Sequence, residues 1–386
     1  MSFEDYFIEN YSFQNRNVII RVDWNIPFND KYKIIDNFRI KSTLKTINFI
    51  IQQNPNRVII ISHLGRPKDK FDIKYSWKNF MNQIENFFPK IILLEDGLSD
   101  KTIDKLKLEE SNIYLLENIR FHEEEINFSI EKNKNIQHLF NNLGNIYVND
   151  AFSCMHRNHL SICGFNKNNN KAYGYLVKKE IEHINLILNN KNNEKILAVI
   201  GGSKIDDKIK LLENLSNQID GIYITGGLIN SILKNNKDKE FIKNIKKNKA
   251  KIFEMKDGLA SDNLNSVYNY YESINLPLNK YFYDIGLLSL IELDNIIKDY
   301  DIIFWNGPLG LIENNIYSIG SNLFIDILIK NKKKVIIGGG DTASFVNKFT
   351  NEIVNKFEYI STAGGSLIDY ISNKTLVGLE YFNYKI

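Results

Sequence analysis

Short runs of β-branched and other apolar residues recur along the chain, and the spacing between them leaves room for helices. The runs cover 17–22, 57–61, 90–94, 113–116, 145–148, 196–200, 220–224, 250–253, 301–305 and 334–337. Segments with helical spacing, such as 38–53 and 321–331, lie between them. Short strands that alternate with helices are typical of parallel sheets covered on both faces. The pattern therefore predicts an α/β fold.

The length of 386 residues is too great for one ordinary hydrophobic core. Residues 175–188 have helical apolar spacing and lie between two polar segments, 166–171 and 189–195, which we interpret as loops. We predict two Rossmann-like lobes, each a parallel sheet flanked by helices, joined by a bridging helix and hinge. The expected boundaries are 1–172, 173–188 and 189–372.

The overall composition excludes several classes of protein. A net charge of +3 is too small to indicate nucleic-acid or membrane binding, and no apolar run approaches the roughly 18 residues of a membrane span. The lysine-rich stretch 234–251 is interpreted as a solvated helix face and loop. Cys154 and Cys163 form no CxxC pair or disulfide framework. We expect a cytoplasmic protein that binds neither nucleic acid nor membrane.

The arginines are few and unevenly placed. Only seven of the 49 Lys and Arg residues are arginine, and none follows Arg157. Arginine can hold a carboxylate or phosphate with two parallel hydrogen bonds, which lysine cannot do. The arginines therefore indicate an anion site in the N-terminal half, although Arg16 and Arg57, at strand starts, are interpreted as structural.

Polar residues follow four of the predicted N-terminal strands. They are Arg21, Asp23 and Asn25; Ser62, His63, Gly65 and Arg66; Glu117, Asn118 and Arg120; and Asn149 and Asp150, with His156, Arg157, Asn158 and His159 shortly after. Ligands of open parallel sheets bind beyond the carboxyl ends of the strands. We therefore expect these residues to form the anion site. His122 is interpreted as structural, and Cys154 as a small filler rather than a nucleophile.

Glycine-rich turns follow the C-terminal strands instead, at 201–202, 226–227, 306–308 and 338–342. Glycines let backbone N–H groups approach phosphate oxygens. Lys204 and Lys208 are four residues apart and can face the same phosphates, and Asp341 beside Thr342 suits Mg²⁺, which prefers oxygen ligands. These turns predict a nucleotide site, although no P-loop motif is present and the loose dinucleotide pattern at 338–343 is weak.

Taken together, the motifs closely resemble the phosphoglycerate kinase family along nearly the whole chain. They are RVDWNIP (21–27), DNFRI (36–40), SHLGRPK (62–68), LLENIRFHEEE (115–125), VNDAFSCMHRNHLS (148–161), GGSKIDDKI (201–209), WNGPLG (305–310) with Glu313, and GGGDTA (338–343). The resemblance implies reversible, Mg²⁺-dependent phosphoryl transfer between 1,3-bisphosphoglycerate and ADP, giving 3-phosphoglycerate and ATP.

The resemblance also implies residue roles. The triose positions are Asp23, Asn25, Arg39, His63, Leu64, Gly65, Arg66, Arg120 and Arg157. The nucleotide positions are Gly202, Ser203, Lys204, Lys208, Gly226, Gly227, Asn306, Pro308, Glu313, Gly339, Gly340, Asp341 and Thr342. The catalytic set is Arg39, Lys204 and Gly340, with Asp341 as the metal ligand. We further expect the tail 373–386 to pack on the N-terminal lobe, and the protein to be a monomer.

Because both possible nucleophiles are ionised near pH 7, we expect catalysis by positioning and electrostatic stabilisation, with hinge closure and without a base. Several positions depart from the family's pattern: Ser153-Cys154, Leu160, Thr225, Ala363, and Phe282-Tyr283 where a Gly-Leu pair usually lies against adenine. These departures leave open a catalytically weakened homologue with altered nucleotide preference.

Three further alternatives can be weighed on the sequence. An inactive scaffold would have lost Arg39, Lys204 or Asp341, and all three are present. A Rossmann dehydrogenase built on 338–343 leaves the arginines unexplained. A lysine-rich RNA-binding protein would bind nucleic acid with a steep salt dependence.

Overall fold

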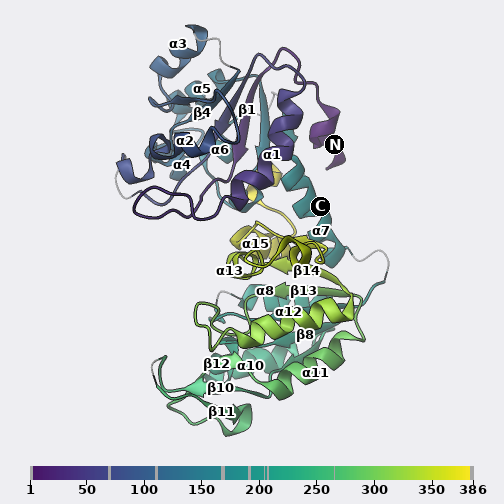
Figure 1. Ribbon diagram of the computed structural model, residues 1–386. Helices are drawn as coiled ribbons and strands as arrows, with labels where there is room; N and C mark the ends of the chain where they lie inside the picture. The colour runs from purple at the N-terminus through teal and green to yellow at the C-terminus, as the bar shows by residue number, and fades with distance from the viewer. Residues whose placement is uncertain are drawn as a thin grey trace. The chain divides into compact units, whose positions relative to one another are not determined.

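The computed structural model describes residues 3–67, 71–108, 112–166, 170–189, 193–203, 205–206, 208–264 and 266–382. The chain divides into two compact units (Figure 1). The first takes in the chain as far as Ile181 together with the residues from Thr375 onward, and the second runs from Glu182 to Lys374. The division falls inside helix α7 (Tyr175–Leu188), whose bounds match the segment that helical spacing picked out.

The first unit is built on a six-stranded sheet in which every pairing is parallel. Its strand order is β3-β4-β2-β1-β5-β6. The strands are β1 (Asn17–Val22), β2 (Arg57–Ile61), β3 (Ile92–Leu94), β4 (Ile113–Leu116), β5 (Ile146–Asp150) and β6 (Asn170–Tyr173). The central strands are buried almost throughout, as expected of a sheet covered on both faces.

Helices cover this sheet (Figure 1). They are α1 (Phe38–Ile51), α2 (Met81–Ile84), α3 (Asp100–Leu108), α4 (Glu123–Ile126), α5 (Lys134–Asn142) and α6 (Leu160–Cys163), with the 3₁₀ turns η5 (Ile119–Phe121) and η6 (Phe152–Cys154). Helix α1 buries Ile40, Ile47 and Ile50, which form one stripe at helical spacing. These side chains belong to the apolar core that includes Trp24 and Trp77.

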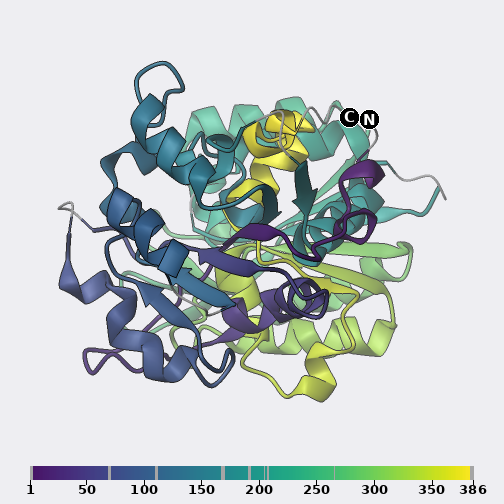
Figure 2. The same cartoon turned by 90° about the horizontal axis from the view of Figure 1, so that it is seen from above.

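The last described segment of the chain packs on this first unit. Helix α16 (Val377–Tyr381) is held by a hydrogen bond from Gly378 N to the carbonyl of Met155, 2.8 Å long. The ring of Phe382 stacks on Tyr173 at 4.3 Å and contacts Tyr6 edge-on at 5.6 Å. The beginning and the end of the described chain therefore lie side by side (Figure 2).

The second unit contains another parallel six-stranded sheet, in the order β15-β14-β13-β7-β8-β9. Its strands are β7 (Ile196–Ile200), β8 (Gly221–Ile224), β9 (Lys251–Glu254), β13 (Ile302–Asn306), β14 (Lys334–Gly338) and β15 (Tyr359–Ile360). Its helices are α8 (Ile209–Gln218), α9 (Leu228–Lys234), α10 (Asn236–Ile245), α11 (Leu287–Ile297), α12 (Ile319–Asn331), α13 (Gly340–Val346), α14 (Asn351–Val354) and α15 (Gly365–Asn373). The predicted α/β class, with two parallel sheets, is confirmed.

A small antiparallel sheet in the second unit is not predicted by the sequence. It has the order β11-β10-β12 and consists of β10 (Asp257–Ser261), β11 (Asn269–Glu272) and β12 (Tyr281–Ile285). Its segments lack the β-branched runs on which the strand predictions relied, and β11 is largely exposed. The interpretation of 166–171 as a loop was also wrong at Asn170 and Lys171, which pair with β5 as part of an edge strand.

Within the described ranges, every helix is too short or too polar to cross a bilayer.

Candidate functional site

The first candidate site lies at the carboxyl edge of the sheet in the first unit. Strands β4, β2, β1 and β5 are neighbours in that order and run parallel, so their carboxyl ends meet at one edge. Several polar residues that follow these strands are thereby brought together, whereas Asp150, also expected here, accepts hydrogen bonds at the start of α7 instead.

Asp23 is the centre of this cluster. Its carboxylate accepts hydrogen bonds from the guanidinium of Arg39 and from the hydroxyl of Ser153, and Nδ1 of His63 lies 3.6 Å from Oδ1. Burial by itself raises the pKa of Asp23, but the charge of Arg39, the hydrogen bond from Ser153 and the charge of Arg21 outweigh it and hold the pKa below its usual range. Asp23 is therefore ionised, and it fixes the position of Arg39.

The turn after β2 forms a second wall of the site. Gly65 has a left-handed φ of +61°, and its N–H donates to Oδ1 of Asn25 at 2.8 Å. The guanidinium of Arg120 donates to the Gly65 carbonyl. Leu64 N donates to Oδ1 of Asn118 at 3.1 Å, so a buried asparagine from the next strand end holds the turn in place.

Positive charge accumulates around this turn. Burial and the neighbouring cation of Arg157 lower the pKa of Arg120, and Nε of Arg120 is buried without a hydrogen-bond partner in the described part of the chain. Arg157 donates from Nε to His156 at 3.0 Å, and Arg66 is exposed beside Gly65. A cluster of cations with an unused N–H donor is suited to an anion with several oxygens.

Arg21 was expected among the polar residues of this edge but without a triose-binding role, and it belongs to the same cluster. Arg21 is buried behind His63, and it contacts His63 and Cys154. Ligand atoms of Asp23, His63 and Cys154 lie within 4.8 Å of one another, close enough to share a metal ion. The guanidinium of Arg21 faces the ligand atoms of both His63 and Cys154, so we assign no metal there.

Two minor predictions can be compared with the structure. Cys154 is buried, and burial raises the pKa of its thiol, in keeping with a filler rather than a nucleophile. The Nε2 atom of His122 accepts a hydrogen bond from Leu98 N at 2.9 Å, which is a structural contact.

The second candidate site is a cavity of about 580 Å³ in the second unit. Predicted nucleotide residues that line it are Gly202, Ser203, Gly227, Pro308, Glu313 and Asp341. Further lining residues come from α9 and β12, namely Asn230, Ser231, Lys234, Tyr281, Phe282 and Tyr283. The sequence pointed to the glycine turns and to 282–283, but not to the contribution of α9.

The glycine turns beneath the cavity pack backbone against backbone. A Cβ on Gly307, where φ is +95°, would lie 2.2 Å from the carbonyl oxygen of Gly201. A Cβ on Gly226 would lie 2.9 Å from the carbonyl oxygen of Pro308. Gly307 N also donates to the hydroxyl of Thr342 at 2.9 Å, which ties this turn to helix α13. Only glycine fits such close approaches.

Lys208 and Asp341 are two of the charged residues predicted for this site that lie in the described part of the chain. Nζ of Lys208 donates to Oδ1 of Asn306, whose Nδ2 is buried without a partner among the described residues. Asp341 is exposed in the first turn of α13, beside Gly339 and Gly340. A Cβ on Gly340 would meet nothing within 4 Å, so its backbone is open to a ligand. Lys204, a predicted catalytic residue, lies outside the described residues.

The aromatic residues of β12 have different surroundings. Phe282 is only 2% exposed, and its ring lies against Gly258 of β10. Its backbone N and O both pair with the side-chain amide of Asn230, at 2.7 and 2.9 Å. Tyr281 is exposed and Tyr283 is half-buried, and the pairing of β12 with β10 is irregular at Tyr283. The ring of Phe282 therefore packs into the sheet interior, whereas Tyr283 is the more exposed of the two substituted residues; both line the cavity.

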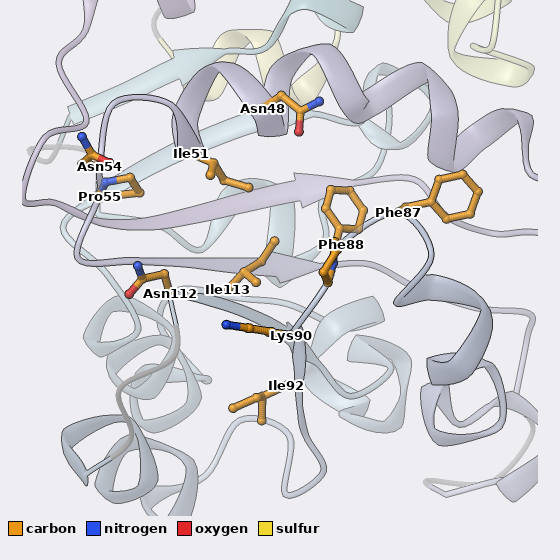
Figure 3. Close-up of a pocket in the computed structure, with 11 residues that line it drawn as sticks. Asn48, Ile51, Asn54, Pro55, Phe87, Phe88, Lys90, Ile92, Asn112 and Ile113 are labelled. Atoms are coloured by element: carbon orange, nitrogen blue, oxygen red, sulfur yellow. The ribbon is translucent and has the colours of Figure 1, made fainter.

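Another hollow, of about 770 Å³, lies at the opposite edge of the first sheet (Figure 3). It is lined by residues that precede the strands, such as Pro55, Lys90 and Asn112. The side chains drawn in Figure 3 include no residue from the predicted sites.

Comparisons with known proteins agree on one family. The sequence profile of phosphoglycerate kinase matches residues 8–374. The chain is 33% identical over 389 residues to phosphoglycerate kinase of Coprothermobacter proteolyticus, covering 96% of this chain and 97% of the relative. It is 35% identical to that of Wigglesworthia glossinidia brevipalpis, with 98% of both chains covered.

Solved structures give the same result. Phosphoglycerate kinase from Coxiella burnetii is similar with a TM-score of 0.82 and 28% identity, over 97% of this chain and 98% of that one. The structure from Pyrococcus horikoshii OT3 has a TM-score of 0.81 at 24% identity, covering 98% of each chain, and shares the fold.

Proposed function

The chain belongs to the phosphoglycerate kinase family, and from that premise we propose how its two units divide the reaction. Members of this family are glycolytic phosphotransferases that act on phosphoglycerate and on ADP or ATP. In the ATP-forming direction, a β-phosphate oxygen of ADP attacks the phosphorus of the acyl phosphate. The bond from that phosphorus to the carboxyl oxygen breaks, and 3-phosphoglycerate leaves as a carboxylate.

We assign the phosphoglycerate to the first unit. The observation that carries this assignment is the largely buried carboxylate of Asp23, which holds Arg39 beside His63 and the turn at Gly65. The guanidinium of Arg120 bonds to that turn. Asn25, Leu64 and Gly65 set the shape of that turn, while Arg66 and Arg157 add positive charge. Fixed cations recognise a phosphate better than mobile ones, because less freedom is lost on binding.

We assign the nucleotide to the cavity of the second unit. Its glycine turns, Gly202 with Ser203, Gly226 with Gly227, and Gly339 with Gly340, present backbone to the ligand. Lys204, Lys208, Asn306 and Thr342 serve the phosphates, and Pro308 and Glu313 line the nucleoside side. Asp341 fits Mg²⁺, since one exposed carboxylate together with phosphate oxygens is a usual ligand set for this ion. When bound, the ion neutralises phosphate charge.

The chemistry needs no general base, because the attacking oxygen is already ionised in both directions. The protein contributes positioning and stabilisation of the charge on the transferred phosphoryl oxygens. We assign this stabilisation to Arg39, Lys204 and the backbone at Gly340.

The two ligands are assigned to different units, so a hinge closure must bring them together, and closure would also exclude water from the acyl phosphate. We propose that the enzyme acts as a monomer in the cytoplasm, where its free Cys154 and Cys163 would stay reduced.

A coupled assay for formation of 1,3-bisphosphoglycerate from 3-phosphoglycerate and Mg-ATP tests the proposal. We expect turnover that disappears on chelation of Mg²⁺. Folded protein without turnover would overturn the assignment. The same assay with GTP tests an altered nucleotide preference, for which Tyr283 at the cavity is the favouring observation.

A further inference from the structure

Arg21 is the most deeply buried arginine of the site, with 1% of its surface exposed. Its side chain starts on β1 and lies behind His63. The guanidinium donates from Nε to the hydroxyl of Ser161 at 2.8 Å and from Nη1 to the carbonyl of Val22. Its Nη2 lies 3.2 Å from Nδ1 of His63 and 3.5 Å from Sγ of Cys154.

A buried carboxylate balances the charge of Arg21. Glu125 is fully buried and accepts hydrogen bonds from the N and Oγ of Ser161 at 2.8 and 2.7 Å. Burial raises the pKa of Glu125, but hydrogen bonds from His159 and Ser161 and the charge of Arg21 lower it overall. Glu125 is therefore ionised. Through Ser161 it holds the guanidinium against His63.

The contact between Arg21 and His63 determines which ring nitrogen carries the proton. A guanidinium has N–H donors and no acceptor. Asp23 Oδ1, at 3.6 Å from the same Nδ1, is beyond hydrogen-bond distance, so in the contact with Arg21 the Nδ1 atom of His63 accepts. The proton of the neutral ring is then on Nε2. A second proton, on Nδ1, would point at the N–H of Arg21.

Some of the other groups that face His63 raise the pKa of its ring, and others lower it. Asp23 favours the charged ring, whereas burial and the cations of Arg21, Arg120 and Arg39 disfavour it. The remaining neighbour is the Cys154 thiol, 3.9 Å from Nδ1. The net effect keeps the pKa of His63 well below its ordinary value. His63 is therefore neutral at physiological pH.

We propose that Arg21 is a positioning residue that fixes His63 as its Nε2–H tautomer, so that His63 presents one hydrogen-bond donor to the phosphoglycerate. Among the described residues, every polar contact of the His63 ring is made by Nδ1. The substrate offers carboxylate, phosphate and hydroxyl oxygens, which accept from an N–H, whereas an unprotonated Nε2 would oppose lone pair to lone pair. The inference rests on the proposed function only for the identity of this acceptor.

Long-range ¹H–¹⁵N NMR of the histidine rings tests the tautomer in the protein without substrate, and so separately from activity. His63→Gln assigns its signals among the six histidines. We expect a pyridine-type Nδ1 and a protonated Nε2 that hold from pH 6 to 8. A protonated Nδ1 at pH 7 would overturn the proposal, whatever the enzyme's activity.

Variants then test the role of Arg21 in binding. Arg21→Lys keeps the charge but loses the fork, and Ser161→Ala cuts the link to Glu125 while keeping Arg21. In both variants we expect the NMR signature of the Nε2–H tautomer to weaken. We also expect KM for 3-phosphoglycerate to rise about 10- to 100-fold, which is the scale of one charged hydrogen bond. KM for ATP should not change. An unchanged tautomer in folded Arg21→Lys would contradict the proposal.

His63→Gln and His63→Asn form a matched pair that does not disturb Arg21. The amide N–H of glutamine can replace Nε2–H, whereas that of asparagine replaces Nδ1–H. We expect His63→Gln to keep a lower KM for 3-phosphoglycerate than His63→Asn. The reverse order would show that the donor is Nδ1 and would overturn the proposal.

Discussion

At the scale of single residues, the first unit pairs several charged groups of its site, whether they are buried, as Arg21 and Glu125 are, or only partly buried, as Asp23 and Arg39 are. Asp23 is held ionised by Arg39, and Glu125 stabilises Arg21 through Ser161. A buried charge is tolerated only when it is paired. The arrangement therefore fixes each cation in one orientation before an anion arrives.

Arg39 is the cation of this set with the most direct proposed role. We expect Arg39→Ala to lower kcat about 10²- to 10³-fold, the scale of losing one preorganised donor. Arg39→Lys should recover little, because an ammonium cannot hold Asp23 and a phosphoryl oxygen with one planar fork. Steady-state kinetics of both variants would measure this. Near-full activity of Arg39→Lys would contradict the argument from fork geometry.

Asp150 is a buried carboxylate outside the proposed chemistry. Its Oδ1 accepts from Leu176 N at 2.8 Å at the start of α7, while its Oδ2 is buried without a partner in the described chain. Burial raises its pKa to about 7. The folded state thus holds a proton that the unfolded chain releases near pH 4. Its contribution to stability is present below pH 4 and is lost as the pH rises to 7.

The free energy of unfolding should fall with rising pH between 4 and 7 because of Asp150. We expect Asp150→Asn to remove this contribution, which is on the order of a few kcal/mol. Urea unfolding of both proteins across that range would measure it. Burial also raises the pKa of Asp284, in the second unit, to about 7. Asp284→Asn is therefore a matched control that should leave the part due to Asp150 in place. Parallel pH curves for Asp150→Asn and the unmodified protein would refute the assignment.

At the scale of elements, the two parallel sheets could be predicted because their strands are buried on both faces. Burial on both faces requires β-branched runs, and the bounds at 17–22, 57–61 and 196–200 match the observed strands. The antiparallel strand β11 was missed because a largely exposed strand needs no such run, and β10 and β12 were missed because their buried residues are not a β-branched run. β6 was missed because its polar edge sequence NKAY is held by backbone pairing.

The candidate sites follow the same logic. Residues after parallel strands could be expected to meet, because topology alone brings strand ends together. The contact of Arg21 with His63 and the contribution of α9 could not be expected. Arg21 points behind the site, and the position of Asn230 depends on pairing with the unpredicted strand β12.

Gly307 tests whether the close packing of the turns is required. Alanine there would take a left-handed φ and place Cβ 2.2 Å from the Gly201 carbonyl oxygen. The backbone conformation alone costs about 1–3 kcal/mol. We expect Gly307→Ala to lower the free energy of unfolding by at least this amount and to weaken ADP binding, measured by urea unfolding and calorimetry.

Gly365→Ala is the matched control, because a Cβ on Gly365 would meet nothing within 4 Å. It should leave both measurements nearly unchanged. If Gly307→Ala changed the free energy of unfolding and ADP binding no more than Gly365→Ala does, the turns would have room for a side chain. The argument that their close backbone contacts require glycine would then be wrong.

At the scale of the whole molecule, the two proposed ligand sites belong to different units, and the chain passes between the units through α7. Phosphoryl transfer requires the reacting oxygen and phosphorus to come within about 3–3.5 Å. One arrangement of the units must therefore be selected when both ligands are present. In the proposed assignment, each ligand contacts one unit only. Neither ligand alone therefore has the higher affinity for the reactive arrangement of the units that would be needed to select that arrangement.

We therefore expect small-angle X-ray scattering to show a smaller radius of gyration with 3-phosphoglycerate and Mg-ADP together than with either alone. Asp23→Asn provides the control, because it weakens the hold on Arg39 and so the phosphoglycerate site, while leaving the nucleotide cavity intact. This variant should keep its thermal stabilisation by Mg-ADP but should not contract. An equal contraction with Mg-ADP alone would mean that nucleotide contacts suffice to close the units, and the two-ligand requirement would be wrong.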